Sequence, residues 1–238
     1  MIPSYQACLH LRDSEAIIAI KYRLGIPVFL VSGPCVACGR HSDALGDHSL
    51  GCAQQGERLS RHHALRDALY QSAQQAVLSP TREERYLLTQ AGREDERPGD
   101  ILIPSWTSGM DTACDVTVIS PLQALTVTKA AREAGSALDT RYRAKMSKYF
   151  DACREQGIHF LPLPVETLGA WHPLAIKAIE KLGRQLGRAT GREVEETVRH
   201  LFQRLSVLLM KGNAALILGR IPAYAPQEVD GDRDTEAN

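Results

Sequence analysis

Near the middle of the chain, two short apolar runs flank a polar segment, and this pattern predicts a pair of strands. Residues 101–103 form a branched apolar run that ends at a proline, and residues 116–119 are rich in β-forming side chains. Residues 105–110 between them are rich in turn formers. We therefore expect an antiparallel hairpin, which brings Asp100, before the first strand, close to Asp115 in the second.

Apolar residues recur at helical spacing elsewhere, and one long amphipathic helix with a buried stripe is expected at 58–78. A lead-in helix at 14–24 has Ser14 as its N-cap. A polar segment at 82–88 is expected to be a strand. A proline-containing strand at 158–165 is expected near a sheet edge. Further helices are expected at 122–137, 138–154, 173–189 and 193–219, the last interrupted at Gly212 and Asn213.

These elements predict an α/β fold in which a small mixed sheet is flanked by helices. The chain has 238 residues, 44% hydrophobic and 24% charged, and contains no apolar run of membrane-spanning length and no secretory pattern. We expect an intracellular, nuclear protein without a membrane partner. The formal net charge is zero, but an acidic tail at 225–238, expected to be disordered, offsets a mildly basic remainder.

A short glycine- and aspartate-rich segment carries a metal-binding spacing. Cys35 and Cys38 form a Cys-x-x-Cys pair, and His48 and Cys52 follow one helical turn apart. Such a knuckle can supply four ligands to a structural zinc ion. His41 is an alternative to His48, and two unrelated thiols beside a surface histidine are the alternative to a metal site. The other cysteines are expected to be core or incidental thiols: Cys8, Cys114 and Cys153.

Acids gather around the expected hairpin. Asp100 and Asp115 would repel each other at adjoining strand ends unless a cation lies between them, and a divalent metal with oxygen ligands meets that need. Glu83 or Glu84 can add a third acid. Without a metal, the two aspartates would be solvated residues at the ends of a surface hairpin.

Basic residues are concentrated in two of the expected helices. Arg61, His62 and Arg66 open the helix at 58–78, and Lys145 and Lys148 lie in a basic stretch of the helix at 138–154. Arg58, Arg61 and Arg66 can contact phosphates, with His62 and Lys148 as further candidates for nucleic-acid binding, although three arginines are equally typical of a solvated helix face. A histidine one turn before an apolar stripe is often a satisfied core residue.

The order of these motifs resembles the C-terminal portion of site-specific non-LTR retrotransposon proteins. In that family a CCHC knuckle precedes a restriction-enzyme-like endonuclease of the PD-(D/E)XK group. The motifs that carry the resemblance cover about residues 35–170: the knuckle, Arg61-His62, Arg97-Pro98-Gly99-Asp100, Asp115-Val116-Thr117-Val118 and Lys145-Met146-Ser147-Lys148-Tyr149.

The resemblance implies roles for particular residues. Asp100 and Asp115 would hold catalytic Mg²⁺ with help from Glu83, and Lys145, or else Lys148, would supply the lysine. The implied division is a lead-in at 1–34, a zinc knuckle at 35–55, a nuclease domain at 56–190, C-terminal helices at 191–224 and the tail. The implied substrate is DNA, with a reverse transcriptase or element RNA as further partners.

Two departures from the family pattern bear on activity. Gly99 separates Pro98 from Asp100, and Thr117 stands where many relatives of the wider group have lysine. The favoured interpretation is a Mg²⁺-dependent DNA endonuclease derived from a retrotransposon protein. The alternative, favoured by Thr117, is a nucleic-acid-binding or scaffold protein that keeps the zinc site and the fold but has lost cleavage.

Overall fold

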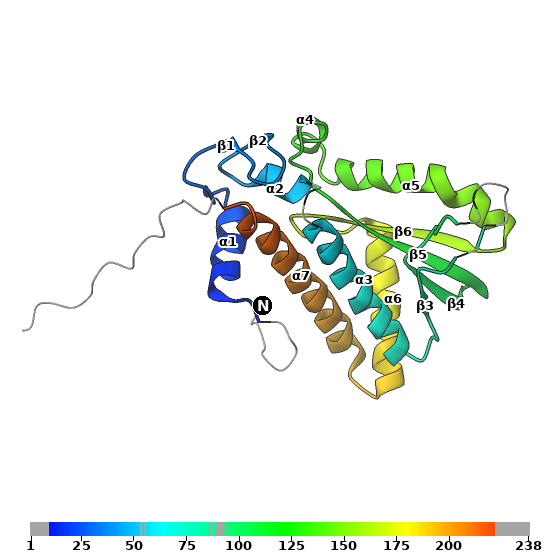
Figure 1. Ribbon diagram of the computed structural model, residues 1–238. Coiled ribbons are helices and arrows are strands. Elements are labelled where there is room, and N and C mark those ends of the chain that lie inside the picture. Colours follow the sequence, from blue (N-terminus) through cyan, green and yellow to red (C-terminus); the bar gives the residue numbers. More distant parts are fainter. Residues whose placement is uncertain are drawn as a thin grey trace, which may run out of the picture.

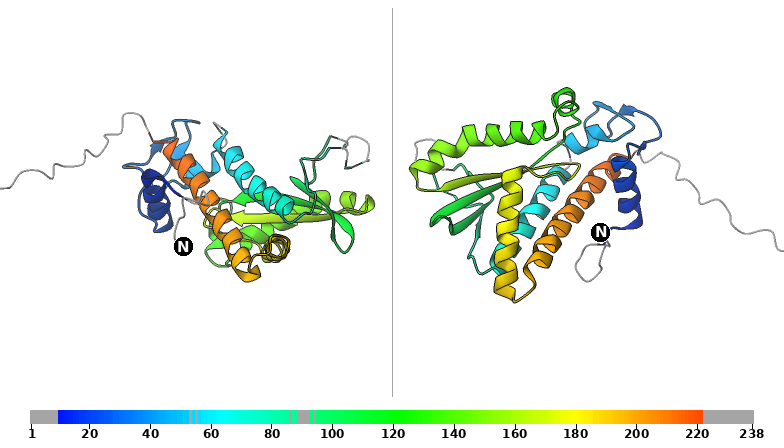
Figure 2. Two further views of the ribbon diagram at one scale, coloured as in Figure 1. Left: turned by 90° about the horizontal axis from the view of Figure 1, so that it is seen from below. Right: turned by 180° about the vertical axis from the view of Figure 1, so that it is seen from behind.

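In the computed structural model of the chain, which describes residues 10–52, 54, 56–85, 87–88, 93 and 95–221, a small mixed sheet is flanked by helices (Figure 1). The strands lie in the order β3-β4-β5-β6. Helix α5 covers one face, and α3, α6 and α7 cover the other (Figure 2). The expected α/β architecture of a small mixed sheet between helices is confirmed at this level. The bounds are β3 Thr81–Arg82, β4 Ile101–Thr107, β5 Met110–Ile119, β6 His159–Glu166, α3 Glu57–Gln75, α5 Ser136–Glu155, α6 Pro173–Thr190 and α7 Val194–Leu218.

The predicted hairpin is present. Strands β4 and β5 pair antiparallel, with Ile101 opposite Cys114, and β5 pairs with β6 in parallel. Strand β6 lies at the edge of the sheet, as its prolines required, because proline has no N–H to donate to a second neighbour. The return from β5 to a parallel β6 needs a long crossover, and α5 lies in that connection.

Alternate residues of β5 face the two helix layers. Cys114 and Val116 lie in the larger core with the expected stripe of α3, which includes Leu65 and Leu69. Ala113 lies in a second core beneath α5. Cys114 and Cys153 are buried thiols, as expected, and burial raises the pKa of each. Asp115, between Cys114 and Val116, therefore lies on the α5 face of the sheet.

The remaining elements gather near one end of the sheet (Figure 1). Helix α1 packs against α7, and the small β1-β2 hairpin and α2 lie beside the C-terminal end of α7. The bounds are α1 Asp13–Arg23, β1 Gly33–Pro34, β2 His41–Ser42, α2 Asp47–Gly51 and α4 Val127–Ala130. The expected tail at 225–238 and Cys8 lie outside the described residues.

Helix α7 is continuous, so the interruption expected at Gly212 and Asn213 is wrong. A side chain at Gly212 would place its Cβ 2.4 Å from Cγ of Arg61, so glycine makes room for an arginine from α3. Asn213 accepts a hydrogen bond from Nη1 of Arg61 at 2.7 Å and donates to the carbonyl of Thr167 at 2.7 Å. Two residues typical of helix ends thus serve a tertiary contact.

Helix α7 is also apolar enough and long enough to cross a membrane by composition, with a mean hydropathy of 1.3 over its most apolar window. Its residues Leu201, Leu205 and Leu209 are buried in the larger core with α3, α6 and the sheet. Packing between helices on one side of the sheet accounts for this hydropathy.

Two expected elements are much shorter than the sequence pattern indicated. Of the strand expected at 82–88, the described residues form only the end of β3, because Glu83 has φ of 49° and leaves the extended conformation. The helix expected at 122–137 is reduced to the four residues of α4. The Thr126 hydroxyl donates to the carbonyls of Ser120 and Pro121, and such local bonds compete with helix formation.

The Arg61–Asn213 contact predicts a stability effect. Asn213→Leu should lower the free energy of unfolding by about 2 to 4 kcal/mol, because a buried guanidinium loses its acceptor. Urea unfolding measures this change. In the matched control, Arg61→Met combined with Asn213→Leu removes both polar partners and should cost less than the two single changes together. Strict additivity would show that the contact contributes nothing.

Candidate metal centres

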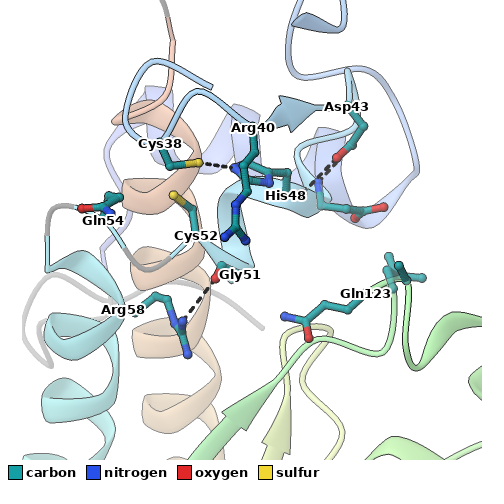
Figure 3. A pocket seen from close by; sticks show the side chains of 12 residues that line it. Cys38, Arg40, Asp43, His48, Gly51, Cys52, Gln54, Arg58 and Gln123 are labelled. Carbon is teal, nitrogen blue, oxygen red and sulfur yellow. Dashed lines mark hydrogen bonds between the residues drawn. The ribbon is translucent and has the colours of Figure 1, made fainter. Parts of the chain in front are cut away.

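A cluster of one histidine and three cysteines lies beside the C-terminal end of α7. The ligand atoms of Cys35, Cys38, His48 and Cys52 all lie within 4.8 Å of one another, and Sγ of Cys38 is 3.2 Å from Nε2 of His48 (Figure 3). This donor set can hold a metal ion and is compatible with zinc. Burial lowers the pKa of His48, which favours the neutral ring that binds metals.

Local backbone geometry brings these ligands together. The N–H of Gly39 donates to the carbonyl of Cys35 at 2.8 Å, and Gly39 has φ of 71°, which turns the chain tightly after Cys38. Both carboxylate oxygens of Asp43 accept N–H groups at the start of α2, the second from His48 at 2.9 Å. His41 lies in β2 and does not belong to the cluster, so the structure selects His48 between the two histidines.

Arg220, which follows α7, lies behind the cluster and supports it. The sequence patterns did not single out this residue. Its side chain is buried, donates to the carbonyl of Gln54 at 2.7 Å and pairs with Glu57 at 3.1 Å. Burial raises the pKa of Cys52, but the backbone N–H of Gln54 and the guanidinium of Arg220 outweigh it and lower the pKa. Arg220 therefore favours the thiolate that a metal needs.

The second centre lies where β4 begins beside β5. Oδ2 of Asp100 accepts the N–H of Val116 at 2.6 Å, and Oδ1 lies 3.1 Å from Nε2 of His62. Burial lowers the pKa of His62, but its hydrogen bond to Asp100 and the charges of Asp100 and Asp115 outweigh burial and raise it. The Asp100 carboxylate is thus fixed by a strand on one side and by α3 on the other.

The extra glycine before Asp100 has a steric reason. A Cβ at Gly99 would lie 3.0 Å from the backbone carbon of Ala113 in β5, closer than side chains normally approach. The N–H of Asp100 donates to the carbonyl of Cys114 at 2.8 Å. Gly99 therefore allows the backbone to lie close to β5 just before Asp100. This close approach places the carboxylate of Asp100 beside Val116.

Asp115 is buried and has one oxygen without a partner. Its side chain is 9% exposed, and Oδ1 lies 2.9 Å from Nζ of Lys145. Oδ2 is buried and, among the described residues, accepts no hydrogen bond. Burial raises the pKa of Asp115 to about 6; Lys145 opposes this effect and the charge of Asp100 adds to it. A buried carboxylate oxygen without a partner is costly, and a cation would satisfy it.

The other residues singled out from the sequence lie around this centre in different settings. Glu83 is held by Arg66 and Arg97, so its carboxylate is paired with two guanidinium groups. Lys148 does not reach Asp115; it is paired with Glu96 at 3.5 Å. The structure thus brings Asp100, Asp115, His62 and Lys145 together.

Arg61 is turned away from solvent. It is 4% exposed and is hydrogen-bonded to Asn213 and, at 3.4 Å, to the carbonyl of Leu50. On helix α3, the side chain of Arg61 therefore points toward α7, and that of the next residue, His62, points toward Asp100. The spacing of a helix, about 100° per residue, separates the two directions.

Comparison with known proteins provides no further identification. No family model matches the chain, and no curated protein matches it. The chemistry of both centres is therefore inferred from their own residues.

The Cys/His cluster predicts one tightly bound zinc ion per chain, measurable by elemental analysis. Arg220→Gln should weaken zinc binding about 10- to 100-fold, as expected for a residue that supports a metal ligand. Competition with a chromophoric chelator measures the affinity. Arg188→Gln, which removes the same charge from an exposed site near the C-terminal end of α6, is the matched control and should keep the parent affinity. Equal affinities for all three proteins would contradict the assignment to Arg220.

The raised pKa of Asp115 predicts a pH-dependent stability. The folded protein holds this proton more tightly than the unfolded chain, so the stabilisation is complete below about pH 4 and is lost as pH rises through about 6. With no added Mg²⁺, the unfolding free energy of the parent should therefore fall relative to that of Asp115→Asn between pH 4 and 7. Asp151→Asn, at an exposed position, should follow the parent. Parallel curves for Asp115→Asn and the parent would refute this.

Proposed function

We propose that this chain is a Mg²⁺-dependent DNA endonuclease derived from a retrotransposon protein, with a restriction-endonuclease-like fold. The observation that carries the proposal is the unpartnered Oδ2 of Asp115, buried beside Asp100 and opposite Lys145. Two carboxylates and a lysine at the meeting of two strands suit metal-assisted hydrolysis of a phosphodiester. The resemblance in motif order supports the same reaction.

The residues of this centre fit Mg²⁺. The ion prefers carboxylate oxygens and keeps several waters, so one or two acids are enough to hold it. Asp115 would bind it through Oδ2, and Asp100 from the neighbouring strand would be the second ligand. When bound, Mg²⁺ lowers the pKa of a coordinated water and offsets charge on the phosphate.

The chain's own groups have separate roles in this proposal. The N–H of Val116 and the ring of His62 orient the carboxylate of Asp100. Lys145 supplies positive charge close to Asp115, where attack on the phosphate builds negative charge. Thr117 cannot supply that charge, so the proposal assigns the task to α5. The paired Glu83 is an outer residue that fixes Arg66 and Arg97.

The Cys/His cluster has a structural role in the proposal. Four protein ligands complete a tetrahedral shell and leave no position for a substrate, which is typical of structural zinc. The segment around β1 and β2 buries few large apolar side chains, so a metal would replace the core that it lacks.

A second function is favoured by the pairing of the charges. Lys145 neutralises Asp115, and both Asp100 oxygens already have partners. A protein with these contacts can bind nucleic acid without cutting it, and would then be a domesticated binding or scaffold protein.

A plasmid-nicking assay with Mg²⁺ or with EDTA distinguishes the two functions. The parent should nick only with Mg²⁺, and Asp100→Asn and Asp115→Asn should abolish nicking. Lys145→Ala should slow it at least ~100-fold, because it removes a charge that stabilises the transition state. Lys148→Ala is the matched control and should have little effect. DNA binding without nicking under any divalent metal would favour the binding protein.

A further inference from the structure

We propose that the groove between the Cys/His cluster and the N-terminal end of α3 binds the phosphate backbone of a polynucleotide and leads it to Asp100 and Asp115. The inference rests on the proposed function for the polymer's identity. It adds a binding path and makes the Cys/His segment one wall of that path. The groove is defined here by Arg40, Arg58, Arg61 and Gln123, together with the two hollows that they line.

Two hollows meet at Arg58. The larger, about 650 Å³, lies between the Cys/His segment and the loop after β5, and Arg40 and Gln123 also line it (Figure 3). The smaller, about 440 Å³, is lined by Arg58, Arg61, His62 and Thr117. Because Arg58 lines both, a chain-like ligand can pass from one hollow to the other.

The cations of the groove lack acidic partners. Among the described residues, Arg40 and Arg58 form no ion pair, and the hydrogen bond of Arg58 goes to the neutral carbonyl of Gly51 at 3.2 Å. The larger hollow is also lined by two acids: Asp43, which accepts two backbone N–H groups at the start of α2, and Asp47, which accepts the hydroxyl of Tyr22 at 3.1 Å. Among the described residues, the smaller hollow is lined by Arg58 and Arg61 and by no acid, so the positive charge without a matching carboxylate lies at that end of the groove.

Arg61 adds an independent sign of an anion site. It is 4% exposed, its hydrogen-bond acceptors are neutral, and within the described part of the chain its Nε has no partner. Burial lowers the pKa of Arg61 to about 10, and the like charge of Arg58 adds to this effect. Two neighbouring guanidinium groups without a carboxylate are costly, and a bound anion would offset that cost.

The start of α3 reinforces the same preference. This 19-residue helix begins after Gly56, which has no side chain to cap the first N–H groups, and Gly56 lines the smaller hollow. The N-terminal end of a long helix attracts anions. Phosphate is the anion that best matches guanidinium geometry.

The groove ends at the acidic centre. His62 lines the smaller hollow and contacts Asp100 at 3.1 Å, and Thr117 lies two residues after Asp115 on β5. A single phosphate would occupy only one of the two hollows that meet at Arg58. Two connected hollows therefore favour a polymer as the ligand. The amide of Gln123 projects into the larger hollow, where it can bond a base (Figure 3).

The experiment measures binding of a labelled single strand, a duplex and an RNA of equal length by fluorescence anisotropy, with no added Mg²⁺ so that no cleavage occurs and the Cys/His cluster keeps its zinc. The readout is the slope of log affinity against log salt, which reports phosphate contacts. Arg58→Gln and Arg40→Gln should each reduce its magnitude by about 0.7 on a single strand, or about 0.9 on a duplex. The three ligands show which polynucleotide the groove prefers.

Arg188→Gln, which removes the same charge from an exposed site near the C-terminal end of α6, should keep the parent slope. Zinc content and circular dichroism verify that each variant is folded. Binding by Arg58→Gln and Arg40→Gln with the parent slope would overturn the groove, and nicking that depends on Asp115 would then leave the proposed function standing. A parent that neither binds nor nicks would overturn both.

Discussion

A buried guanidinium needs hydrogen-bond partners, and both terminal nitrogens of Arg61 find acceptors by joining separate segments of the chain. From α3 it reaches Asn213 in α7 and the carbonyl of Leu50 in α2, and Asn213 continues to the carbonyl of Thr167 after β6. Gly212 gives its stem room against α7. Because burial makes each missing partner costly, these four segments are held in one arrangement.

That arrangement fixes the orientation of the other side chains of α3. With Arg61 fixed toward α7, His62 lies against Asp100, and Arg66, one turn later, holds Glu83. The acidic centre therefore depends on a helix from one face of the sheet and on Lys145 from the other. Asp115, between them, is buried deeply enough that its pKa rises to about 6, so its charge depends on the cations around it.

The Cys/His cluster is tied to the same framework by Arg220. This residue follows α7, pairs with Glu57 at the start of α3, and favours the thiolate of Cys52. Metal binding and the packing of α3 against α7 are thereby linked through one side chain. In the proposed binding path, this link holds the segment that carries Arg40 in a fixed position relative to Arg58 on α3.

The sequence by itself determined the elements whose patterns are strong and local. The β4-β5 hairpin, the buried stripe of α3 and the edge position of β6 follow from apolar spacing and from proline chemistry. Cysteine spacing likewise indicated the Cys/His cluster. Such features depend on neighbours within a few residues, so a linear pattern is enough to predict them.

Only the tertiary structure decided the features that depend on distant partners. Gly212 and Asn213 suggested a helix break, yet they serve Arg61, which is 152 residues from Asn213 in the chain. Arg220 showed no local pattern, and Lys145 and Lys148 were nearly equivalent until the packing of α5 brought one of them to Asp115. Burial and hydrogen bonding across the fold set these roles, because the cost of an unpaired buried charge arises only once the segments are packed together.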